Sequence, residues 1–100
     1  MPNESAVSRF QAVLRHEMPV SAERFHVTSL GLFGSYVRDE QHHGSDLDIL
    51  VTFDDVPSLF QIVSLENHLA DLPGIKVDLV LRDSLKPHIG RNILQHVVAV

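Results

Sequence analysis

A Gly-Ser pair between two apolar segments constrains the fold more than any other feature of this sequence. Residues 27–33, VTSLGLF, are rich in branched and aromatic residues and predict a strand, which Gly34 ends. Residues 47–53, LDILVTF, predict a second strand in the same way. Because side chains alternate along a strand, Asp46 and Asp48 are expected on one face of it and the alternate apolar residues on the other.

The spacing of apolar residues and the positions of proline and glycine predict the remaining elements. Pro19 is expected to stop the first helix, and Pro73-Gly74 the helix that begins near Leu59. The apolar tail 97–100 fits either a last helical turn or a short strand. Helices are predicted at 4–18, 35–40, 59–72 and 84–95, and a third strand at 76–81. This order predicts the α+β or α/β class, a small mixed sheet of three or four strands with helices packed on it.

Composition excludes several classes of protein. The chain has 100 residues, which is typical of a single domain spanning 1–100. Its net charge of −5 with His neutral argues against direct nucleic-acid binding, which needs clustered Lys and Arg. The chain contains no cysteine, so disulfides and cysteine-bound zinc are excluded. Neither a membrane-spanning apolar run nor a secretory signal is visible, and a cytoplasmic location is expected.

Three aspartates are candidate metal ligands. Asp46 and Asp48 lie roughly 6.6 Å apart along a strand, a spacing that lets both reach one cation or bridge two. Their mutual repulsion would be relieved by Mg²⁺, which prefers carboxylates and phosphate oxygens. Asp78 lies inside the strand-like segment KVDLVL and joins them if this strand pairs beside the second one. Taken singly, an Asp-x-Asp pair fits a solvated strand edge and Asp78 a surface acid, but their succession favours a joint site.

The glycine-serine turn supplies candidate phosphate ligands. Gly34 permits a tight turn and leaves backbone N–H groups accessible. A helix beginning at Ser35 would direct its N-terminus at phosphate, and the Ser35 hydroxyl adds a donor. Arg38, one turn later, can contact phosphate or the nucleotide. Together with the three acids, the turn predicts a site for a metal-bound triphosphate.

The spaced motif Gly34-Ser35-x10-Asp46-x-Asp48, followed by a strand that contains Asp78, resembles the nucleotidyltransferases of the DNA polymerase β superfamily. The segments GSYVRDE at 34–40 and SDLDILV at 45–51 are most similar to the minimal nucleotidyltransferases (MNT). These include the antitoxin component of prokaryotic HEPN/MNT toxin–antitoxin pairs. The resemblance covers about residues 27–97 and implies a polymerase β-like palm fold.

The resemblance also implies an activity and a partner. Such an antitoxin is a protein adenylyltransferase that transfers AMP from ATP to a tyrosine of a HEPN ribonuclease toxin, with which it forms a hetero-oligomer. Asp46, Asp48 and Asp78 would hold two Mg²⁺ ions and carry catalysis, and Gly34, Ser35 and Arg38 would bind the nucleotide phosphates. No residue in the sequence identifies the base, so ATP as the donor rests on the resemblance alone.

Two other functions stay open. The chain could neutralise its toxin by contact without turnover, or could modify the hydroxyl of a small molecule. The acid triad favours turnover, and the absence of room for a second substrate-binding domain favours a protein acceptor. The apolar tail 93–100 is a candidate contact surface, or else packs on the sheet.

Other residues depart from the family pattern or imitate another one. Asp39 stands where the family commonly has Gly, and is expected either to stiffen the turn or to add negative charge beside the triphosphate. His42-His43 is expected to be a solvated loop rather than a metal site. Arg91 and His96 match a HEPN ribonuclease spacing by chance, with Arg91 expected at the surface and His96 partly buried.

Overall fold

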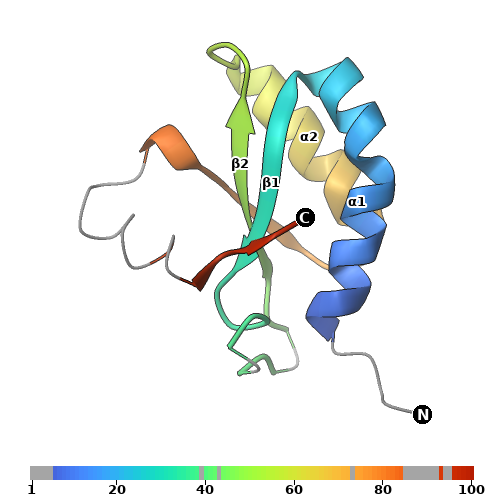
Figure 1. Cartoon of the computed structure of the whole chain (residues 1–100), viewed down its shortest axis with the longest axis vertical. Coiled ribbons are helices and arrows are strands. Elements are labelled where there is room, and N and C mark those ends of the chain that lie inside the picture. The colour runs from blue at the N-terminus through green and yellow to red at the C-terminus, as the bar shows by residue number, and fades with distance from the viewer. Residues whose placement is uncertain (1–5, 39, 43, 73, 85–92, 94–95) are drawn as a thin grey trace.

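A four-stranded mixed sheet forms the centre of the molecule (Figure 1). The computed structural model describes residues 6–38, 40–42, 44–72, 74–84, 93 and 96–100. Strand β1 (Val27–Phe33) pairs antiparallel with β2 (Leu47–Phe53) and with the short β4 (Val98–Ala99), while β3 (Val77–Leu81) runs parallel to β2. The strand order is β3-β2-β1-β4, which confirms the predicted mixed sheet.

Helices α1 (Ala6–Phe25) and α2 (Leu59–Asp71) pack on one face of this sheet (Figure 1). The prediction that Pro19 stops the first helix is wrong, because the helix continues through it to Phe25. Ser21 is completely buried and Phe25 nearly so, so packing of the last helical turns against the core offsets the hydrogen bond that proline cannot make. Within the described residues, no helix is long and apolar enough to cross a membrane.

Two further predicted helices differ from the structure. Residues 35–38 form a hydrogen-bonded turn rather than a helix, in which Arg38 N–H donates to Gly34 O at 3.1 Å. The helix predicted at 84–95 falls largely outside the described residues, and the structure shows a 3₁₀ turn at Arg82–Ser84. The apolar tail forms β4 against β1, where Gly31 lies opposite Ala99, so this part of the tail packs on the sheet.

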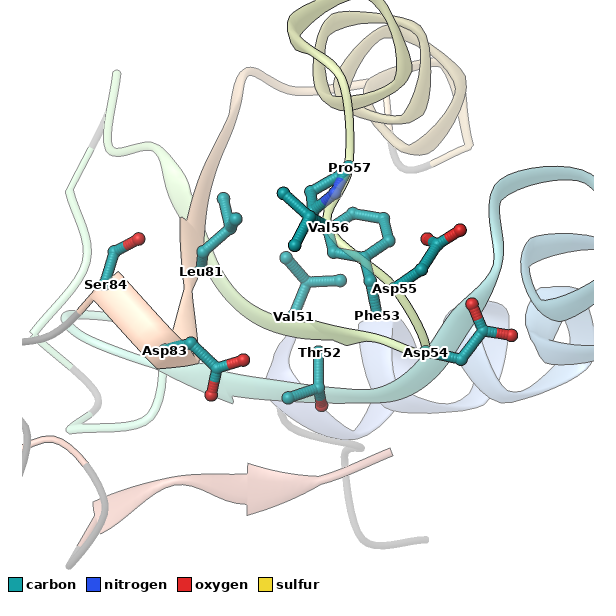
Figure 2. A pocket seen from close by; sticks show the side chains of 10 residues that line it. All are labelled: Val51, Thr52, Phe53, Asp54, Asp55, Val56, Pro57, Leu81, Asp83 and Ser84. Atoms are coloured by element: carbon teal, nitrogen blue, oxygen red, sulfur yellow. The ribbon is translucent and has the colours of Figure 1, made fainter.

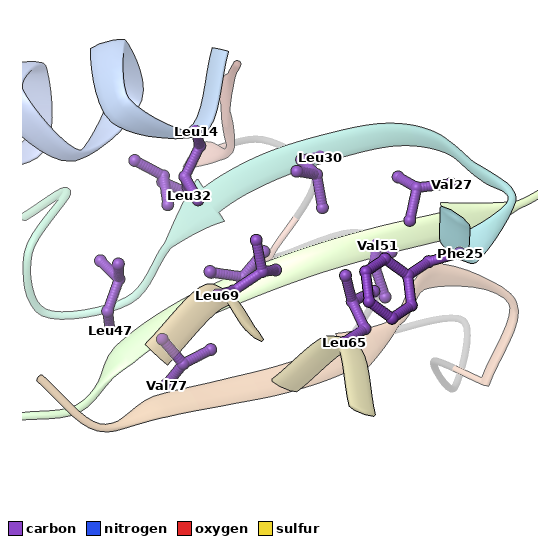
Figure 3. Close-up of a cluster of buried hydrophobic side chains, with 11 residues drawn as sticks. Leu14, Phe25, Val27, Leu30, Leu32, Leu47, Val51, Leu65, Leu69 and Val77 are labelled. Atoms are coloured by element: carbon purple, nitrogen blue, oxygen red, sulfur yellow. The ribbon is translucent and has the colours of Figure 1, made fainter. Parts of the chain in front are cut away.

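The hydrophobic core lies between the sheet and the two helices, as Figure 3 shows. Leu47, Ile49 and Val51 alternate along β2 and are all buried, which confirms the predicted apolar face. The other labelled members of this core come from both helices and from β1 and β3: Leu14, Phe25, Val27, Leu30, Leu32, Leu65, Leu69 and Val77. Because the helices cover this face, the opposite face of the sheet stays available to the polar residues of the strands.

The start of α2 offers a direct test of the local structure. Ser58 Oγ accepts a hydrogen bond from Gln61 N–H at 3.1 Å and caps the helix. Replacing Ser58 with Ala should lower the free energy of unfolding by about 1 kcal/mol, because an N-terminal N–H loses its partner. For a domain of this size the melting temperature should fall by roughly 4–8 °C. The matched change Ser64→Ala, at an exposed position inside the same helix, should leave the melting temperature unchanged or raise it slightly.

Candidate active site

The turn and two of the predicted acids meet on the sheet face that the helices leave uncovered. At the end of β1, Phe33 lies opposite Asp48 of β2. Asp48 in turn lies opposite Asp78 of β3, because these two strands are parallel and in register. Gly34, which follows Phe33, therefore stands beside the Asp48 carboxylate. Phe33, Asp48 and Asp78 thus form one row across the sheet. The turn after β1 and the strands β2 and β3 therefore contribute to a single site.

The groups around Asp48 shift the pKa of its carboxyl. Partial burial raises the pKa of the Asp48 carboxyl above its ordinary value, and the negative charges of Asp78 and Asp46 raise the same pKa further. When protonated, Asp48 hydrogen-bonds to Asp78, which also favours its neutral form. The nearby positive charge of Arg38 acts in the opposite direction and lowers the pKa. The ionised form of Asp48 is therefore less stable than in water, and a bound cation would stabilise it.

Asp46 lies close enough to raise the pKa of Asp48, but it does not complete a metal-binding cluster among the described residues. It precedes β2 and is half-buried. Across the described residues, no three His, Cys, Asp or Glu side chains are arranged to hold a metal ion. The structure thus brings Asp48 and Asp78 together and leaves Asp46 as their neighbour. Carboxylate oxygens are still the donor type that Mg²⁺ prefers, so the chemistry of the three residues fits this ion.

Gly34 is required by geometry at this point. Its φ angle is +82°, a backbone conformation that residues with a side chain rarely adopt. A Cβ atom added to Gly34 would overlap the Asp48 carboxylate. Glycine therefore allows both the turn and the position of Asp48, and this confirms the predicted tight turn.

The other predicted phosphate ligands lie in the turn that follows. Ser35 is half-buried and Arg38 is exposed. Arg38 Nε donates to Glu40 Oε2 at 3.0 Å, an ion pair that the sequence analysis did not predict. Contact of the guanidinium with a phosphate would compete with this pair. Asp39, the departure from the family pattern, lies outside the described residues.

Two hollows lie beside the acids, and several of the residues that line them could not be predicted from the sequence. One, of about 420 Å³, is lined by Asp46 together with Tyr36, His42, Gly44, Ser45, Ile75 and Lys76. The other, of about 260 Å³, is lined by Phe33, Gly34, Arg38, Ile93 and His96. His96 was predicted to be partly buried, but it is exposed at this second hollow. His96 and Arg38 line the same hollow because of the path that the C-terminal tail takes, and this path cannot be predicted from the local sequence.

The role of Gly34 can be tested with matched glycines. Gly44 has a φ of +91° and Gly74 a φ of +71°, but nothing lies within 4 Å of a Cβ added at either. Replacing either with Ala should cost about 1–2 kcal/mol of stability from backbone strain alone. Gly34→Ala should cost about 3 kcal/mol or more, because the clash with Asp48 is added. Equal losses at the three positions, measured by denaturant unfolding, would contradict a specific contact between Gly34 and Asp48.

The raised pKa of Asp48 predicts a pH-dependent stability. A carboxyl whose pKa is higher in the folded state favours folding below its unfolded pKa of about 3.9, and loses this contribution as the pH rises through the folded pKa. In EDTA, Asp48→Asn should therefore melt at a higher temperature than the wild type at pH 7, and the difference should shrink toward pH 4. The control Asp55→Asn, in an exposed turn, should show no such trend. A lower melting temperature for Asp48→Asn at pH 7 would contradict the repulsion.

Comparison with known proteins identifies the family of the chain. Residues 20–100 match the family described as "Nucleotidyltransferase domain". The chain is 43% identical over 94 residues to the protein adenylyltransferase MntA of Thermococcus cleftensis, an alignment that covers 94% of this chain and 95% of that protein. The two proteins thus correspond over almost their whole lengths.

Solved structures agree with the sequence comparison. A structure described as a minimal nucleotidyltransferase superposes with a TM-score of 0.73 at 30% identity, covering 93% of this chain and 90% of that one. A chain of a toxin–antitoxin structure with AMP-PNP superposes with a TM-score of 0.68 at 26% identity, covering 94% of this chain and 71% of that one. The chain therefore belongs to the nucleotidyltransferase domain family and has the fold of its minimal members.

Proposed function

We propose that this chain is an antitoxin that acts as a protein adenylyltransferase, moving AMP from ATP to a tyrosine hydroxyl of a cognate HEPN ribonuclease toxin. One observation carries the proposal: Asp48 and Asp78 lie opposite each other on neighbouring strands, beside the Gly34 turn. The chain that contains this arrangement is 43% identical over 94 residues to a protein adenylyltransferase. The superposition on a toxin–antitoxin structure with AMP-PNP supports both the nucleotide and the class of partner. Because ATP is the donor, we place the reaction in the cytoplasm.

The proposed transfer uses the residues of the site in distinct roles. The acceptor oxygen forms a bond to the α-phosphorus of ATP, the bond from this phosphorus to the bridging oxygen breaks, and pyrophosphate leaves. We assign Asp78 to accept the proton of the hydroxyl, because it is exposed and an acceptor protein can reach it. Gly34 N–H and the Ser35 hydroxyl would hold the β- and γ-phosphates. Arg38 would add a contact to phosphate after releasing Glu40.

Asp46, Asp48 and Asp78 are the residues that we propose hold two Mg²⁺ ions. When bound, these ions supply charge stabilisation at the attacking and leaving oxygens. The fit rests on the carboxylate donors and on the raised pKa of Asp48, since repulsion between neighbouring acids favours occupancy by a divalent cation.

A protein acceptor is favoured over a small molecule. The T. cleftensis relative is named for adenylyl transfer to protein, and the alignment covers 95% of its length. The acceptor hydroxyl would then be presented by the toxin, and the two proteins would form a hetero-oligomer.

The intact mass of the toxin tests the proposal. The HEPN-domain protein encoded beside this chain should gain the mass of one or more AMP groups after incubation with the chain, ATP and Mg²⁺. The gain should map to tyrosine and disappear in EDTA. The double substitution Asp46→Asn/Asp48→Asn should slow transfer by at least about a hundredfold, because it removes charges that hold the metal-bound triphosphate.

Two outcomes would contradict the proposal. If the toxin mass does not change although both versions of the chain bind it tightly, the chain neutralises its toxin by contact alone. If transfer survives the double substitution at the wild-type rate, Asp46 and Asp48 do not hold the reacting nucleotide.

A further inference from the structure

An exposed apolar patch lies at the start of α2. The large apolar side chains that are exposed in the described part of the chain all fall within eight residues. Val56 is 94% exposed, Leu59 76%, Phe60 87% and Val63 48%. Apolar side chains exposed singly are normal, but a contiguous group of this kind usually marks an interaction surface. We call these four residues the α2 patch.

The α2 patch is separate from the face by which α2 packs on the core. Leu65 and Leu69 are completely buried against the sheet, and they define the inner face of the helix. At about 100° per residue, Leu59, Phe60 and Val63 fall together on the opposite side of the helix. Leu59 and Val63 are therefore exposed, although the helical spacing of the apolar residues continues through them. The helix has a second apolar face that the fold does not use.

An acidic hollow of about 410 Å³ adjoins the patch (Figure 2). Val51, Leu81 and Val56 give it apolar walls. Asp54 and Asp55 stand at one side and Asp83 at the other, as Figure 2 shows. The described residues that line the hollow include these three aspartates and no Lys, Arg or His.

A histidine lies beside Asp54 at this rim. His26 Nδ1 is 3.7 Å from Asp54 Oδ1, and both side chains are more than half exposed. Asp55 and Asp83 form no ion pair with another described residue. The surface therefore combines apolar side chains with two carboxylates, Asp55 and Asp83, that form no ion pair with another described residue.

The α2 patch and the hollow are remote from the transfer site. Asp48 is near the start of β2, whereas Asp54 follows the end of the same strand. Six residues of extended chain separate them, which corresponds to roughly 20 Å. A molecule bound at the patch would therefore contact neither the phosphates nor the acids at 48 and 78. This surface can affect how a partner is held without contributing to the chemical step.

Charge distinguishes between the possible occupants of this surface. In a symmetric dimer of this chain, the aspartates around one patch would approach those of the other, and both chains carry a net charge of −5. A partner with Lys or Arg beside its apolar residues would instead be attracted. A helix suits the surface best, since a partner helix can pack on Leu59, Phe60 and Val63 and extend a basic side chain into the hollow.

We propose that the α2 patch and the adjoining acidic hollow form a docking surface for a basic amphipathic helix of the acceptor protein. The identification of the partner as the acceptor rests on the function proposed above. The exposed apolar side chains and the acidic rim are independent of that function. Docking there would hold the acceptor while its hydroxyl reaches Asp78 at the other end of the sheet.

Binding measurements on matched variants test this surface. Calorimetry would measure the affinity of the full chain for the HEPN-domain protein encoded beside it. Phe60→Ala should raise the Kd at least tenfold, because a central aromatic contact is lost. The control His16→Ala, at an exposed site on α1 and away from this face, should leave it unchanged. Asp55→Lys should also raise the Kd, whereas Asp71→Lys, with the same change in charge at the other end of α2, should not.

A second readout separates this inference from the proposed function. For the Phe60→Ala chain, the KM for the acceptor protein should rise while kcat and the affinity for ATP stay unchanged. If the wild type binds the partner through Phe60 but transfers no AMP, the proposed function fails and the docking surface stands. The inference is overturned if the wild type does not bind, if Phe60→Ala binds as tightly, or if Phe60→Ala only dissociates a dimer of this chain.

Discussion

The parallel pairing of β2 with β3 is the interaction on which the rest of the site depends. It places Asp48 directly beside Asp78, and the antiparallel pairing of β1 brings Gly34 against the same carboxylate. A shift of one residue in either register would move these acids to the buried face of the sheet. The buried side chains Leu47 and Ile49 prevent such a shift, because it would expose both of them. The core thus fixes the position of the carboxylates.

The pairing of β2 with β3 also places negatively charged carboxylates close together, so they repel one another. Partial burial and the neighbouring charges of Asp78 and Asp46 raise the pKa of Asp48, so the ionised site is less stable than it would be with a neutral residue. Repulsion of this kind is a common feature of functional sites, where residues that destabilise the fold are retained for binding or catalysis. If these acids hold Mg²⁺, as we propose, the bound cation would relieve this repulsion.

Several elements could be predicted from the sequence because their signals are local. The bounds of β1 and β2 follow from branched and aromatic residues that end at Gly34 and Phe53, and both match the structure. The continuation of α1 past Pro19 could not be predicted, since it depends on the burial of Ser21 and Phe25 by distant residues. The outward face of α2 was missed for a related reason: periodicity identifies apolar positions on a helix but not which of them the core has room to cover.

The most direct test of the central claim is the stabilisation of the chain by ATP and Mg²⁺, followed as the shift in melting temperature. At saturating ligand, about a hundred times its Kd, binding should stabilise the wild type by about 2.7 kcal/mol. If Asp48 and Asp78 hold a metal-bound triphosphate, the shift should require Mg²⁺ and should be lost in Asp48→Asn/Asp78→Asn, whose fold is retained. An equal shift in that variant, or one that persists in EDTA, would show that the nucleotide binds elsewhere.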